Sequence, residues 1–320
     1  MSTYLVTGGA GFIGSHIVEA LLKAGQRVKV LDNLLSGRIE NLSFTRRYAR
    51  RGRNFILITG DIRDLKTCER ACRGVDYVFH QAALRSVPKS MQHPREYNEV
   101  NIGGTLNILL ASKKTGVRRV VYASSSSVYG ETNVFPEKEN FLPHPISPYA
   151  CSKLAGEYYC QVFSASFGLE TVSLRYFNVF GPRQSLESQY AIVVPQFIVS
   201  LLHNERPPIY GDGKQSRDFT YIDNVVEANL LAMKIPGISG EVFNIASGKD
   251  YSVLALLKIL NNILHKKIKP RFVPPRAGDV QRTWADISKA KGKLGFLPKV
   301  DFQKGLEKTV TWFRERYSQT

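Results

Sequence analysis

Short runs of β-branched and aromatic residues alternate with helical patterns of apolar residues through the first 180 residues. The runs that predict strands are Tyr4–Thr7, Arg27–Asp32, Asn54–Thr59, Asp76–Gln81, Arg118–Ala123 and Glu170–Tyr176. Helical patterns lie between most of these runs, for example at Ile13–Ala24 and Asn101–Thr115. Because strands that alternate with helices form parallel sheets, the pattern predicts an α/β fold with a Rossmann-like, doubly wound parallel sheet. Ligands of such sheets bind beyond the carboxyl ends of the strands.

The pattern changes after Gly181, where prolines become frequent and the expected elements less regular. The helices expected there are Ile192–His203, Tyr221–Met233 and Tyr251–Leu264. A strand-like run over Gly240–Ala246 is expected to return to the first sheet. The chain is thus predicted to form a first domain, residues 1–180, and a smaller second lobe, residues 181–320.

Composition narrows the class of protein. Of the 320 residues, 43% are hydrophobic and 22% charged, as in ordinary globular proteins. The longest apolar runs are too short to cross a bilayer, and the N-terminus lacks the regions of a signal peptide. We therefore expect a cytoplasmic protein with no membrane partner. The four cysteines are too few for a disulfide framework, and nothing completes a metal site around Cys68 and Cys72.

The net charge of +17, from 44 Lys and Arg against 27 Asp and Glu, favours an anionic partner. Nucleic acid, a membrane surface and a phosphorylated small molecule are the classes to consider. The densest basic cluster is Arg46, Arg47, Arg50, Arg51 and Arg53. We interpret it mainly as a solvated helix face or loop, which is what runs of charge usually are. No aromatic RNA-binding signature accompanies it, so no nucleic acid is expected as a partner.

A glycine-rich turn follows the first predicted strand and opens a helix. Gly8, Gly11 and Gly14 lie in the run TGGAGFIG, where they permit a tight turn and let a pyrophosphate approach the helix N-terminus. Asp32 ends the second predicted strand, the position from which a carboxylate binds an adenosine ribose diol and repels a 2′-phosphate. The cofactor predicted is therefore NAD rather than NADP.

Small and polar residues follow two later strands of the predicted sheet. Asp61 and Ile62, after the third strand, could frame an adenine ring. The segment Gln81-Ala82-Ala83, after the fourth strand, leaves room for the pyrophosphate and ribose. Each segment alone could equally be packing.

Candidate acid–base chemistry lies at the start of a capped helix. Ser147 and Pro148 are typical first residues of a helix, which places Tyr149 and Lys153 on one face. A phenol of pKa about 10 is a weak base at neutral pH, but a nearby ammonium group and the positive nicotinamide ring lower that pKa. Tyr149 is then expected to remove a proton from a sugar hydroxyl, and Lys153 to bind the nicotinamide ribose.

Four serines, at positions 124 to 127, follow the strand Arg118–Ala123 and precede VYG. Their hydroxyl groups face the ligand crevice of the predicted sheet, so one of them could relay a proton between Tyr149 and a substrate. A plain polar turn is the alternative interpretation, and it must hold for at least two of the four.

With these residues in place, the chain resembles the extended short-chain dehydrogenase/reductase superfamily. TGGAGFIGSH, the serine run before VYG and YACSK are similar to its nucleotide-sugar branch, and the resemblance extends from about Thr3 to Lys289. The cofactor residues that it implies are Gly8, Gly11, Phe12, Ile13, Gly14, Asp32, Asn33, Ser36, Gly37, Asp61, Ile62, Gln81, Ala82, Ala83, Asn101, Tyr149, Lys153 and Tyr176. The resemblance therefore makes the first domain the NAD-binding domain.

The resemblance also implies a UDP-sugar site in the second lobe. GDGKQSRDFTYIDN resembles the segment in which an arginine, here Arg217, holds the diphosphate. RAGD resembles the motif in which Arg276 binds phosphate and Asp279 binds the uridine ribose. The substrate residues implied are Ser86, Ser125, Ser126, Tyr149, Asn178, Ile192, Val193, Phe197, Tyr210, Arg217, Arg276, Asp279 and Thr283.

The serine run separates branches of the superfamily. Dehydratases and UDP-glucuronate decarboxylases carry an acidic residue before the Tyr-Gly pair, whereas only serines precede Val128 here, which implies simple 4-epimerisation. By position, Ser125 corresponds to the catalytic serine, with Ser126 and Ser127 auxiliary. The run also resembles that of UDP-glucuronate 4-epimerases, but RYFNVFGPRQ and YAIVVPQF are more similar to UDP-N-acetylglucosamine 4-epimerases of surface-polysaccharide pathways.

The residue before Trp-Ala-Asp is expected to set the size of the sugar pocket. Family members with tyrosine there are restricted to glucose and galactose, and a small residue resembles those that also take N-acetylated sugars. Here the residue is Thr283, whose hydroxyl could bind an acetamido group. Another wall of the pocket, formed by Ile192 or Phe197, is the alternative determinant.

The resemblance thus implies an NAD-dependent epimerase that interconverts UDP-N-acetylglucosamine and UDP-N-acetylgalactosamine through a 4-keto intermediate, with UDP-glucose and UDP-galactose as weaker substrates. The alternatives are UDP-glucose 4-epimerase, UDP-glucuronate 4-epimerase or decarboxylase, and an idle NAD-binding regulatory protein. It also implies a homodimer joined through helices near Arg95–Lys114 and Tyr149–Phe167.

Overall fold

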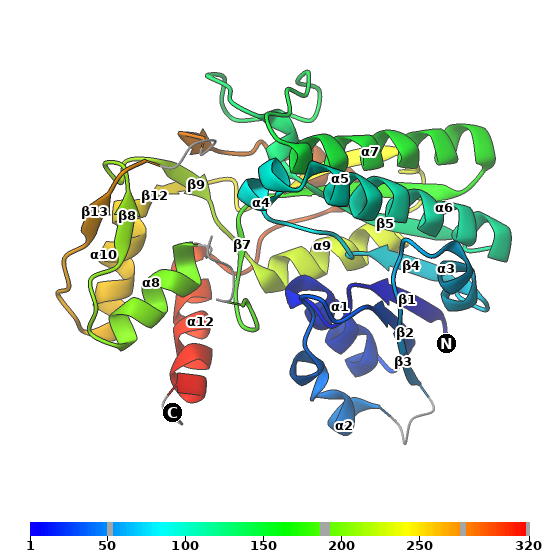
Figure 1. Ribbon diagram of the computed structural model, residues 1–320, viewed down its shortest axis with the longest axis horizontal. Helices are drawn as coiled ribbons and strands as arrows, with labels where there is room; N and C mark the ends of the chain where they lie inside the picture. The colour runs from blue at the N-terminus through cyan, green and yellow to red at the C-terminus, as the bar shows by residue number, and fades with distance from the viewer. Residues whose placement is uncertain (50–53, 186–192, 276–279, 318–320) are drawn as a thin grey trace.

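A parallel β-sheet lies at the centre of the computed structural model, which describes residues 1–49, 54–185, 193–275 and 280–317 (Figure 1). Within these residues the sheet has seven strands. In their order across the sheet they are β11 (Glu241–Ile245), β6 (Glu170–Tyr176), β5 (Arg119–Ser125), β4 (Tyr77–His80), β1 (Thr3–Thr7), β2 (Arg27–Asp32) and β3 (Phe55–Thr59). Every neighbouring pair is parallel, which confirms the predicted α/β fold.

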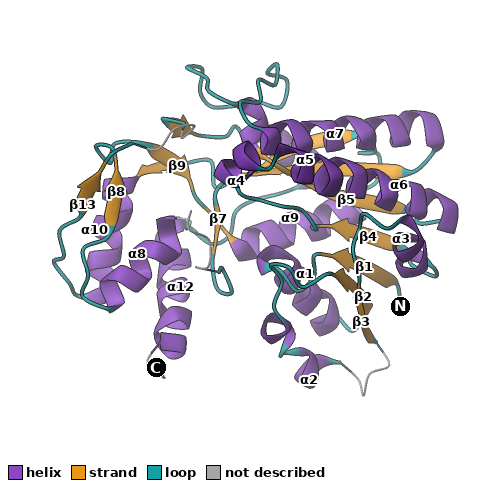
Figure 2. Ribbon diagram, viewed as in Figure 1, coloured by secondary structure: helices purple, strands orange, loops and turns teal. Residues whose placement is uncertain are grey.

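Helices cover both faces of this sheet (Figure 2). The helices on one face are α3 (Leu65–Cys72), α6 (Gly104–Thr115) and α7 (Pro148–Phe167). The helices on the other face are α1 (Phe12–Lys23), α9 (Ile222–Lys234) and α11 (Ser288–Leu294). The short elements between them are η1 (Ile39–Leu42), α2 (Thr45–Tyr48), α4 (Val87–Gln92), α5 (Pro94–Tyr97), the π-helix η2 (Asn98–Gly103) and η3 (Ser126–Tyr129).

Alternate residues of the central strands enter two different hydrophobic cores. Leu5 and Val78 pack with α3, α6 and α7, whereas Val6 and Phe79 pack with α1 and α9. All four side chains are fully buried. Because both faces of the sheet are covered, its inner strands are continuous apolar runs rather than alternating ones.

The chain forms a second group of elements at the left of Figure 1. Its helices are α8 (Val193–Leu202), α10 (Val253–Leu264) and α12 (Phe302–Tyr317). Its strands are β7 (Val179–Phe180), β8 (Pro208–Tyr210), β9 (Ser216–Asp218), β10 (Thr220–Tyr221), β12 (Asp250–Ser252), β13 (Arg271–Val273) and β14 (Arg282–Thr283). Strand β11 returns to the central sheet beside β6, as predicted for Gly240–Ala246. The division into residues 1–180 and 181–320 stays a prediction.

Two predicted helices differ from their sequence patterns at their N-terminal ends by more than one residue. The region predicted as one helix over Asn101–Thr115 starts as the π-helix η2, and regular α-helix begins at Gly104. The helix predicted from Tyr251 starts at Val253, because the Ser252 hydroxyl accepts a hydrogen bond from the Ala255 amide at 3.1 Å and caps it.

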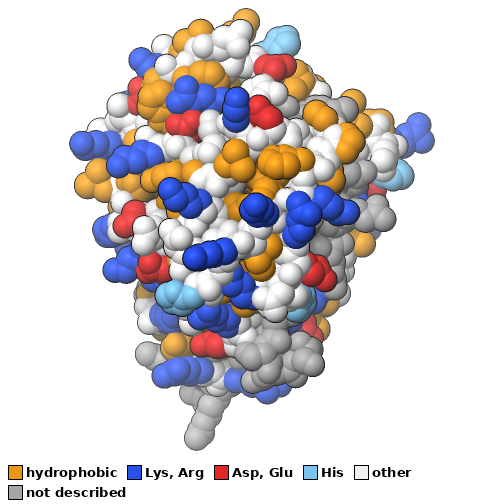
Figure 3. All heavy atoms as spheres, turned by 90° about the vertical axis from the view of Figure 1, so that its left-hand side faces the viewer, with side chains coloured by type: hydrophobic (Ala, Val, Ile, Leu, Met, Phe, Trp, Pro, Cys, Tyr) orange, Lys and Arg blue, Asp and Glu red, His pale blue; other side chains and the backbone are white. Residues whose placement is uncertain are grey.

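Figure 3 looks onto the second group of elements, over which Lys and Arg side chains are interspersed with hydrophobic ones. The basic side chains visible on this face are spread out rather than gathered in one stripe, so the surplus of positive charge is distributed there. No helix within the described residues is long and apolar enough to cross a membrane.

Candidate active site

The glycine-rich turn joins β1 to α1 at the carboxyl edge of the sheet. Gly8 has a φ of +65°, in the left-handed region that side chains disfavour. A Cβ atom on Gly14 would lie 2.2 Å from the Gly8 carbonyl oxygen, so neither position accepts a larger residue. The turn therefore leaves the N-terminus of α1, with its positive dipole end, open to a phosphate.

Asp32, at the end of β2, holds the loop beside this turn. Its Oδ2 atom accepts a hydrogen bond from the Ala10 amide at 2.9 Å, and its Oδ1 atom accepts one from the Leu34 amide at 2.8 Å. Burial raises the pKa of this carboxyl group. Because a carboxylate offers about four lone pairs, Asp32 can still bind a ribose diol.

A cavity of about 190 Å³ lies along the carboxyl ends of the central strands. It begins between β1 and β4, which are neighbours in the sheet although the chain continues from them toward opposite edges. Ligands of such sheets bind at this kind of switch point. The predicted cofactor residues that line it are Gly8, Gly11, Phe12, Ile13, Gly14, Asp32, Asn33, Ser36, Gly37, Asp61, Ile62, Gln81, Ala82, Ala83, Tyr149, Lys153 and Tyr176. The glycine cradle and the ribose-facing carboxylate fit a bound dinucleotide.

Asn101 is the predicted cofactor residue that does not line the cavity. It is buried, its Oδ1 atom accepts a hydrogen bond from the Leu84 amide at 2.8 Å, and its Nδ2 atom donates to the Leu84 carbonyl at 3.0 Å. Nδ2 also donates to the Ser152 hydroxyl at 2.9 Å. Asn101 therefore fixes the loop that follows β4 against helix α7.

Helix α7 presents Tyr149 and Lys153 to the cavity. Ser147 caps this helix by accepting a hydrogen bond from the Ala150 amide at 3.2 Å, as its sequence predicts. Lys153 Nζ lies 5.9 Å from the centre of the Tyr149 ring and donates to the Ala123 carbonyl at 2.8 Å. Burial lowers the pKa of Lys153 to about 8.

The pKa of the Tyr149 hydroxyl group differs from the sequence-based expectation. Burial raises its pKa above the ordinary value, and a hydrogen bond with Ser125 and the charge of Arg85 act in the lowering direction. Burial outweighs these two lowering contributions, and the Lys153 ammonium group donates to the Ala123 carbonyl.

The serines after β5 separate into two environments. Ser124 is buried and donates to the carboxylate of Glu157, which also pairs with Arg175 at 2.7 Å. Ser125 instead contacts Tyr149, and its hydroxyl donates to Ser127 Oγ at 3.1 Å. Ser125 is therefore the serine that lies beside the phenol, while Ser126 and Ser127 begin the short helix η3.

Sequence reasoning missed Arg85, which lines the same cavity as Tyr149. It follows the small residues Ala82 and Ala83 along the loop after β4. A charged residue in a loop predicted to pass the ligand was the available signal. Arg63, Glu96 and Arg183 also line the cavity without having been predicted.

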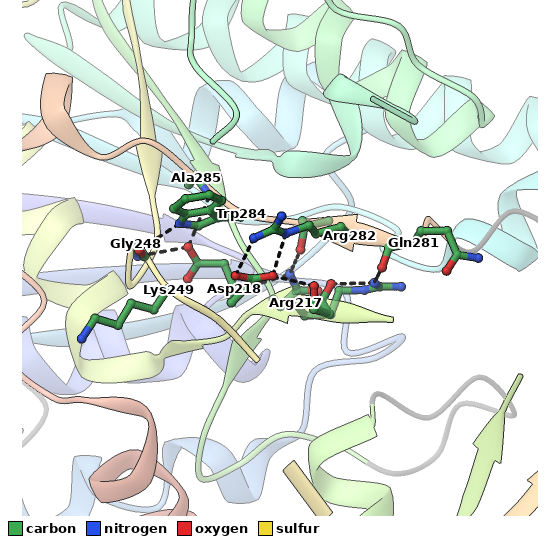
Figure 4. Close-up of polar contacts among 12 residues, drawn as sticks. Arg217, Asp218, Gly248, Lys249, Gln281, Arg282, Trp284 and Ala285 are labelled. Carbon is green, nitrogen blue, oxygen red and sulfur yellow. Dashed lines mark hydrogen bonds and ion pairs between the residues drawn. The ribbon is translucent and has the colours of Figure 1, made fainter. Parts of the chain in front are cut away.

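Three predicted substrate residues meet where strands of the second lobe pair. Thr283 on β14 is in register with Arg217 on β9. Asn178 Nδ2 donates to the Thr283 hydroxyl at 2.8 Å. Arg217 Nη1 donates to the carbonyls of Ser216, at 2.8 Å, and Gln281, at 3.3 Å (Figure 4).

The other predicted substrate residues are more dispersed. Ser86 caps helix α4, and Tyr210 ends strand β8. Val193 begins α8 and is half-buried, whereas Phe197 on the same helix is fully buried in the hydrophobic core. The remaining three, Ile192, Arg276 and Asp279, lie outside the described residues.

Asp218 holds the middle of the second lobe together. Its carboxylate accepts hydrogen bonds from the Ser247 amide at 2.8 Å, the Ser247 hydroxyl at 2.6 Å and the Gly248 amide at 3.0 Å. Figure 4 shows it beneath Trp284, whose Nε1 donates to the Gly248 carbonyl at 3.0 Å. Burial raises the pKa of Asp218 to about 6. No group of metal-binding side chains occurs within the described residues.

Comparison with known proteins decides between families that use such a cavity. The profile of the NAD dependent epimerase/dehydratase family matches residues 4–246, most of the chain. The chain belongs to this family. The predicted resemblance is thereby confirmed, as are NAD as the cofactor and an enzyme as the class of protein.

Three solved structures show how far the similarity extends. A UDP-N-acetylglucosamine 4-epimerase from Methanobrevibacter ruminantium, in complex with UDP-N-acetylmuramic acid, is 42% identical with a TM-score of 0.93, covering 100% of this chain and 99% of that one. A UDP-glucose 4-epimerase from Thermotoga maritima, with UDP-glucose, is 43% identical with a TM-score of 0.92, covering 98% and 99%. A UDP-glucose 4-epimerase from Thermus thermophilus, in complex with NAD, is 39% identical with a TM-score of 0.88, covering 98% and 99%.

Proposed function

We propose that the protein interconverts UDP-N-acetylglucosamine and UDP-N-acetylgalactosamine by inverting carbon C4, with UDP-glucose and UDP-galactose as weaker substrates. The observation that carries this proposal is that Tyr149, which has Ser125 beside it, lines one cavity together with Lys153 and a glycine cradle that fits NAD. The small residue at position 283 supports the N-acetylated pair. Similarity to relatives named for both UDP-sugars supports a 4-epimerase of this kind.

Tyr149 acts as the base in this proposal. In its phenolate form Tyr149 removes the proton of the sugar 4-hydroxyl and becomes the neutral phenol, and Ser125 shares that proton through the hydrogen bond between them. Lys153, whose Nζ lies 5.9 Å from the centre of the phenol ring, would bind the nicotinamide ribose beside Tyr149. When bound, NAD supplies the reversible oxidation of C4.

The second lobe holds the UDP arm while the sugar reorients. Arg217 binds the diphosphate, Asn178 and Thr283 face the sugar, and Ser86, Val193 and Tyr210 complete the wall. Arg276 and Asp279 contribute to phosphate and ribose binding as the resemblance implies. Because the anchoring groups act on the UDP part, the 4-keto sugar can turn and accept hydride at C4 on its other face.

The apolar surface of α6 and α7 supports a homodimer. Leu110 on α6 is 42% exposed, and Tyr158, Val162 and Phe167 on α7 are 51%, 47% and 45% exposed. Both helices lie on the same face of the sheet (Figure 1). We propose that two copies join through these helices, and that the enzyme acts in the cytoplasm in polysaccharide biosynthesis.

Thr283→Tyr tests the choice of sugar. Thr283 is nearly buried and accepts the hydrogen bond from Asn178, so its hydroxyl can still donate to an acetamido oxygen. We expect the wild type to turn over both pairs of UDP-sugars, and Thr283→Tyr to lose the N-acetylated pair while keeping the plain pair. The measurement is kcat/KM for all four sugars, with Thr283→Ser as the matched control that keeps a small hydroxyl residue.

Equal loss on both pairs in Thr283→Tyr, or a wild type that ignores N-acetylated sugars, would make UDP-glucose 4-epimerase the better assignment. An idle NAD-binding protein is the outcome if none of the four sugars is converted although NAD is released from the heat-denatured protein.

A further inference from the structure

Arg85 lines the active-site cavity and has no hydrogen-bond or ion-pair partner among the residues that the structure describes. The other basic groups of the cavity have partners: Lys153 donates to the Ala123 carbonyl, Arg63 pairs with Asp61 at 2.8 Å, and Arg183 pairs with Glu19. Arg38, which also lines the cavity, is not without a partner either. Within the described residues, no hydrogen bond or ion pair joins Arg85 to another group, and its side chain is exposed where it lines the cavity. An arginine keeps its charge at neutral pH, so this position calls for an anion.

The acidic groups of the cavity do not neutralise this charge. They are Asp32, Asp61 and Glu96. Asp32 accepts the amides of Ala10 and Leu34, and Asp61 binds Arg63. Neither these two nor Glu96 forms an ion pair with Arg85 among the described residues. The cation is therefore available to a ligand.

The backbone on both sides of Arg85 is fixed. Leu84 is held through its amide and its carbonyl by the side chain of Asn101, at 2.8 and 3.0 Å. The Ser86 amide donates to the Tyr97 hydroxyl at 3.0 Å, and the Ser86 hydroxyl caps helix α4. A side chain presented from such a loop loses little backbone entropy on binding, which favours selective recognition.

The guanidinium group lies near the reacting end of the cavity. Arg85 and Tyr149 line the same cavity. The Ser86 amide, directly after Arg85, donates to the Tyr97 hydroxyl at 3.0 Å, and the rings of Tyr97 and Tyr149 meet edge to face at 6.5 Å. Tyr149 is the group proposed to take the C4 hydroxyl proton. Substituents on the carbons next to C4 are therefore the parts of the sugar that Arg85 can reach.

We infer that Arg85 binds a carboxylate carried beside C4, so that the preferred substrates are UDP-activated 2-acetamido sugar acids. This inference rests on the proposed function, and it adds the acid group to the acetamido group for which Thr283 leaves room. The planar guanidinium matches a carboxylate in two parallel hydrogen bonds. The Methanobrevibacter relative was solved with UDP-N-acetylmuramic acid, a sugar nucleotide of the acid class, which supports the inference. The competing anion is the pyrophosphate of NAD.

The test compares acid and neutral sugars in wild type and in Arg85→Gln. We expect the wild-type kcat/KM to be higher for UDP-N-acetylglucosaminuronate or UDP-N-acetylmuramate than for UDP-N-acetylglucosamine. In Arg85→Gln this acid-to-neutral ratio should fall about 10- to 150-fold, the effect of losing one charged hydrogen-bonding partner. In Arg85→Lys the ratio should fall less, because lysine keeps the positive charge but lacks the planar pair of donors. Which of the two acids is preferred identifies the neighbour of C4 that carries the carboxylate.

Arg63→Gln is the matched control, since it removes a charge from the same cavity at a residue that already has a partner. Its acid-to-neutral ratio should equal that of the wild type. Bound NAD, measured after heat denaturation, separates the two anions. Loss of NAD from Arg85→Gln, with equal loss of activity on acid and neutral sugars, overturns the inference in favour of the pyrophosphate.

Failure of the inference and failure of the proposed function give different results. A wild type that epimerises UDP-N-acetylglucosamine without preferring either acid overturns the inference alone. A wild type that prefers acids regardless of the acetamido group contradicts the proposed substrate, while the role of Arg85 stands. If no sugar turns over, calorimetry can measure the affinities of acid and neutral UDP-sugars for Tyr149→Phe and for the Tyr149→Phe/Arg85→Gln double variant. The acid-to-neutral ratio of these affinities should then fall in the double variant, and an unchanged ratio overturns the inference.

Discussion

The cofactor cavity and the substrate region are built in different ways. The cavity is lined mainly by short segments directly after strands, and the glycine turn fixes its shape through backbone geometry alone. The substrate region depends on side chains from distant segments, such as Asn178, Arg217 and Thr283, which meet through strand pairing and one hydrogen bond. We therefore expect the backbone-built cavity to stay constant while single substitutions in the proposed substrate region change the sugar that is accepted.

The two regions also differ in their buried charges. Lys153 and Arg85 line the cavity, whereas the proposed substrate region contains two buried carboxyl groups, Asp218 and Glu137. Asp218 is fully hydrogen-bonded, but neither carboxylate oxygen of Glu137 has a partner within the described residues. The comparison predicts that variants in the cavity change the chemical step and that variants of the sugar- and phosphate-binding side chains change substrate binding. A variant at Glu137 is predicted to change stability.

Tyr149→Phe should give the largest effect. Removing the hydroxyl group deletes the proposed base, so kcat should fall about 10²- to 10⁴-fold. UDP-sugar affinity and NAD content should stay close to wild type, because neither depends on that proton. Steady-state kinetics, calorimetry and the NAD content of the purified protein provide the measurements. Tyr158→Phe, an exposed tyrosine on the same helix, is the control.

A Tyr149→Phe variant with near-normal kcat would remove Tyr149 as the base. It would also erase the proposed separation between the two regions.

Arg217→Ala should give an effect of intermediate size, and that effect should be on substrate binding rather than on the chemical step. Loss of a charged hydrogen bond to the diphosphate costs about 1.5–3 kcal/mol, or roughly 10- to 150-fold in affinity for UDP. We expect KM to rise with kcat less affected, since the base and the cofactor cavity remain intact. Titration with UDP checks the affinity, and Arg206→Ala, an exposed arginine near the same lobe's β8, is the control. Unchanged UDP affinity would mean that the diphosphate binds elsewhere.

Glu137→Gln should give the smallest effect, confined to stability and its pH dependence. Burial, reinforced by the nearby Asp218, raises the pKa of Glu137 to about 8, while Arg217 and Arg175 act in the lowering direction. Because the ordinary pKa is 4.5, the folded protein retains a proton between pH 4.5 and 8 that the unfolded chain has lost. The stability of the wild type should therefore fall as the pH rises through this window.

The amide of Glu137→Gln is the same size and does not ionise, so this variant should lose the pH-dependent decrease. We expect Tm at pH 8 to exceed that of the wild type by roughly 2–4 °C, the shift for about 1 kcal/mol, with a smaller difference at pH 5. Thermal unfolding from pH 5 to 9 checks this, with the exposed Glu131→Gln as the control. A parallel pH profile in variant and wild type would show that Glu137 is ionised throughout.

The cofactor region was largely predictable because its signals are local. Glycine spacing, a terminal aspartate and a helix cap each act within a few residues, and the structure places the residues they indicated around one cavity, with nearly all of the further cofactor residues that the resemblance implied. Asn101 was the exception, since its side chain turns away to hold Leu84. Which hydroxyl of the serine run contacts Tyr149 also depended on packing, because Glu157 and Arg175 engage Ser124.

The sequence by itself determined the parallel α/β sheet, the NAD cradle and the pairing of Tyr149 with Lys153, because these follow from periodicity and from short-range backbone and capping rules. Only the tertiary structure decided that Thr283 meets Asn178 and Arg217, and that, within the described part of the chain, Arg85 in the cavity and the buried carboxyl group of Glu137 have no partner. Those properties depend on which segments pack around a side chain. Burial and the loss or gain of a charged partner are set by residues far away in the chain, which no local pattern encodes.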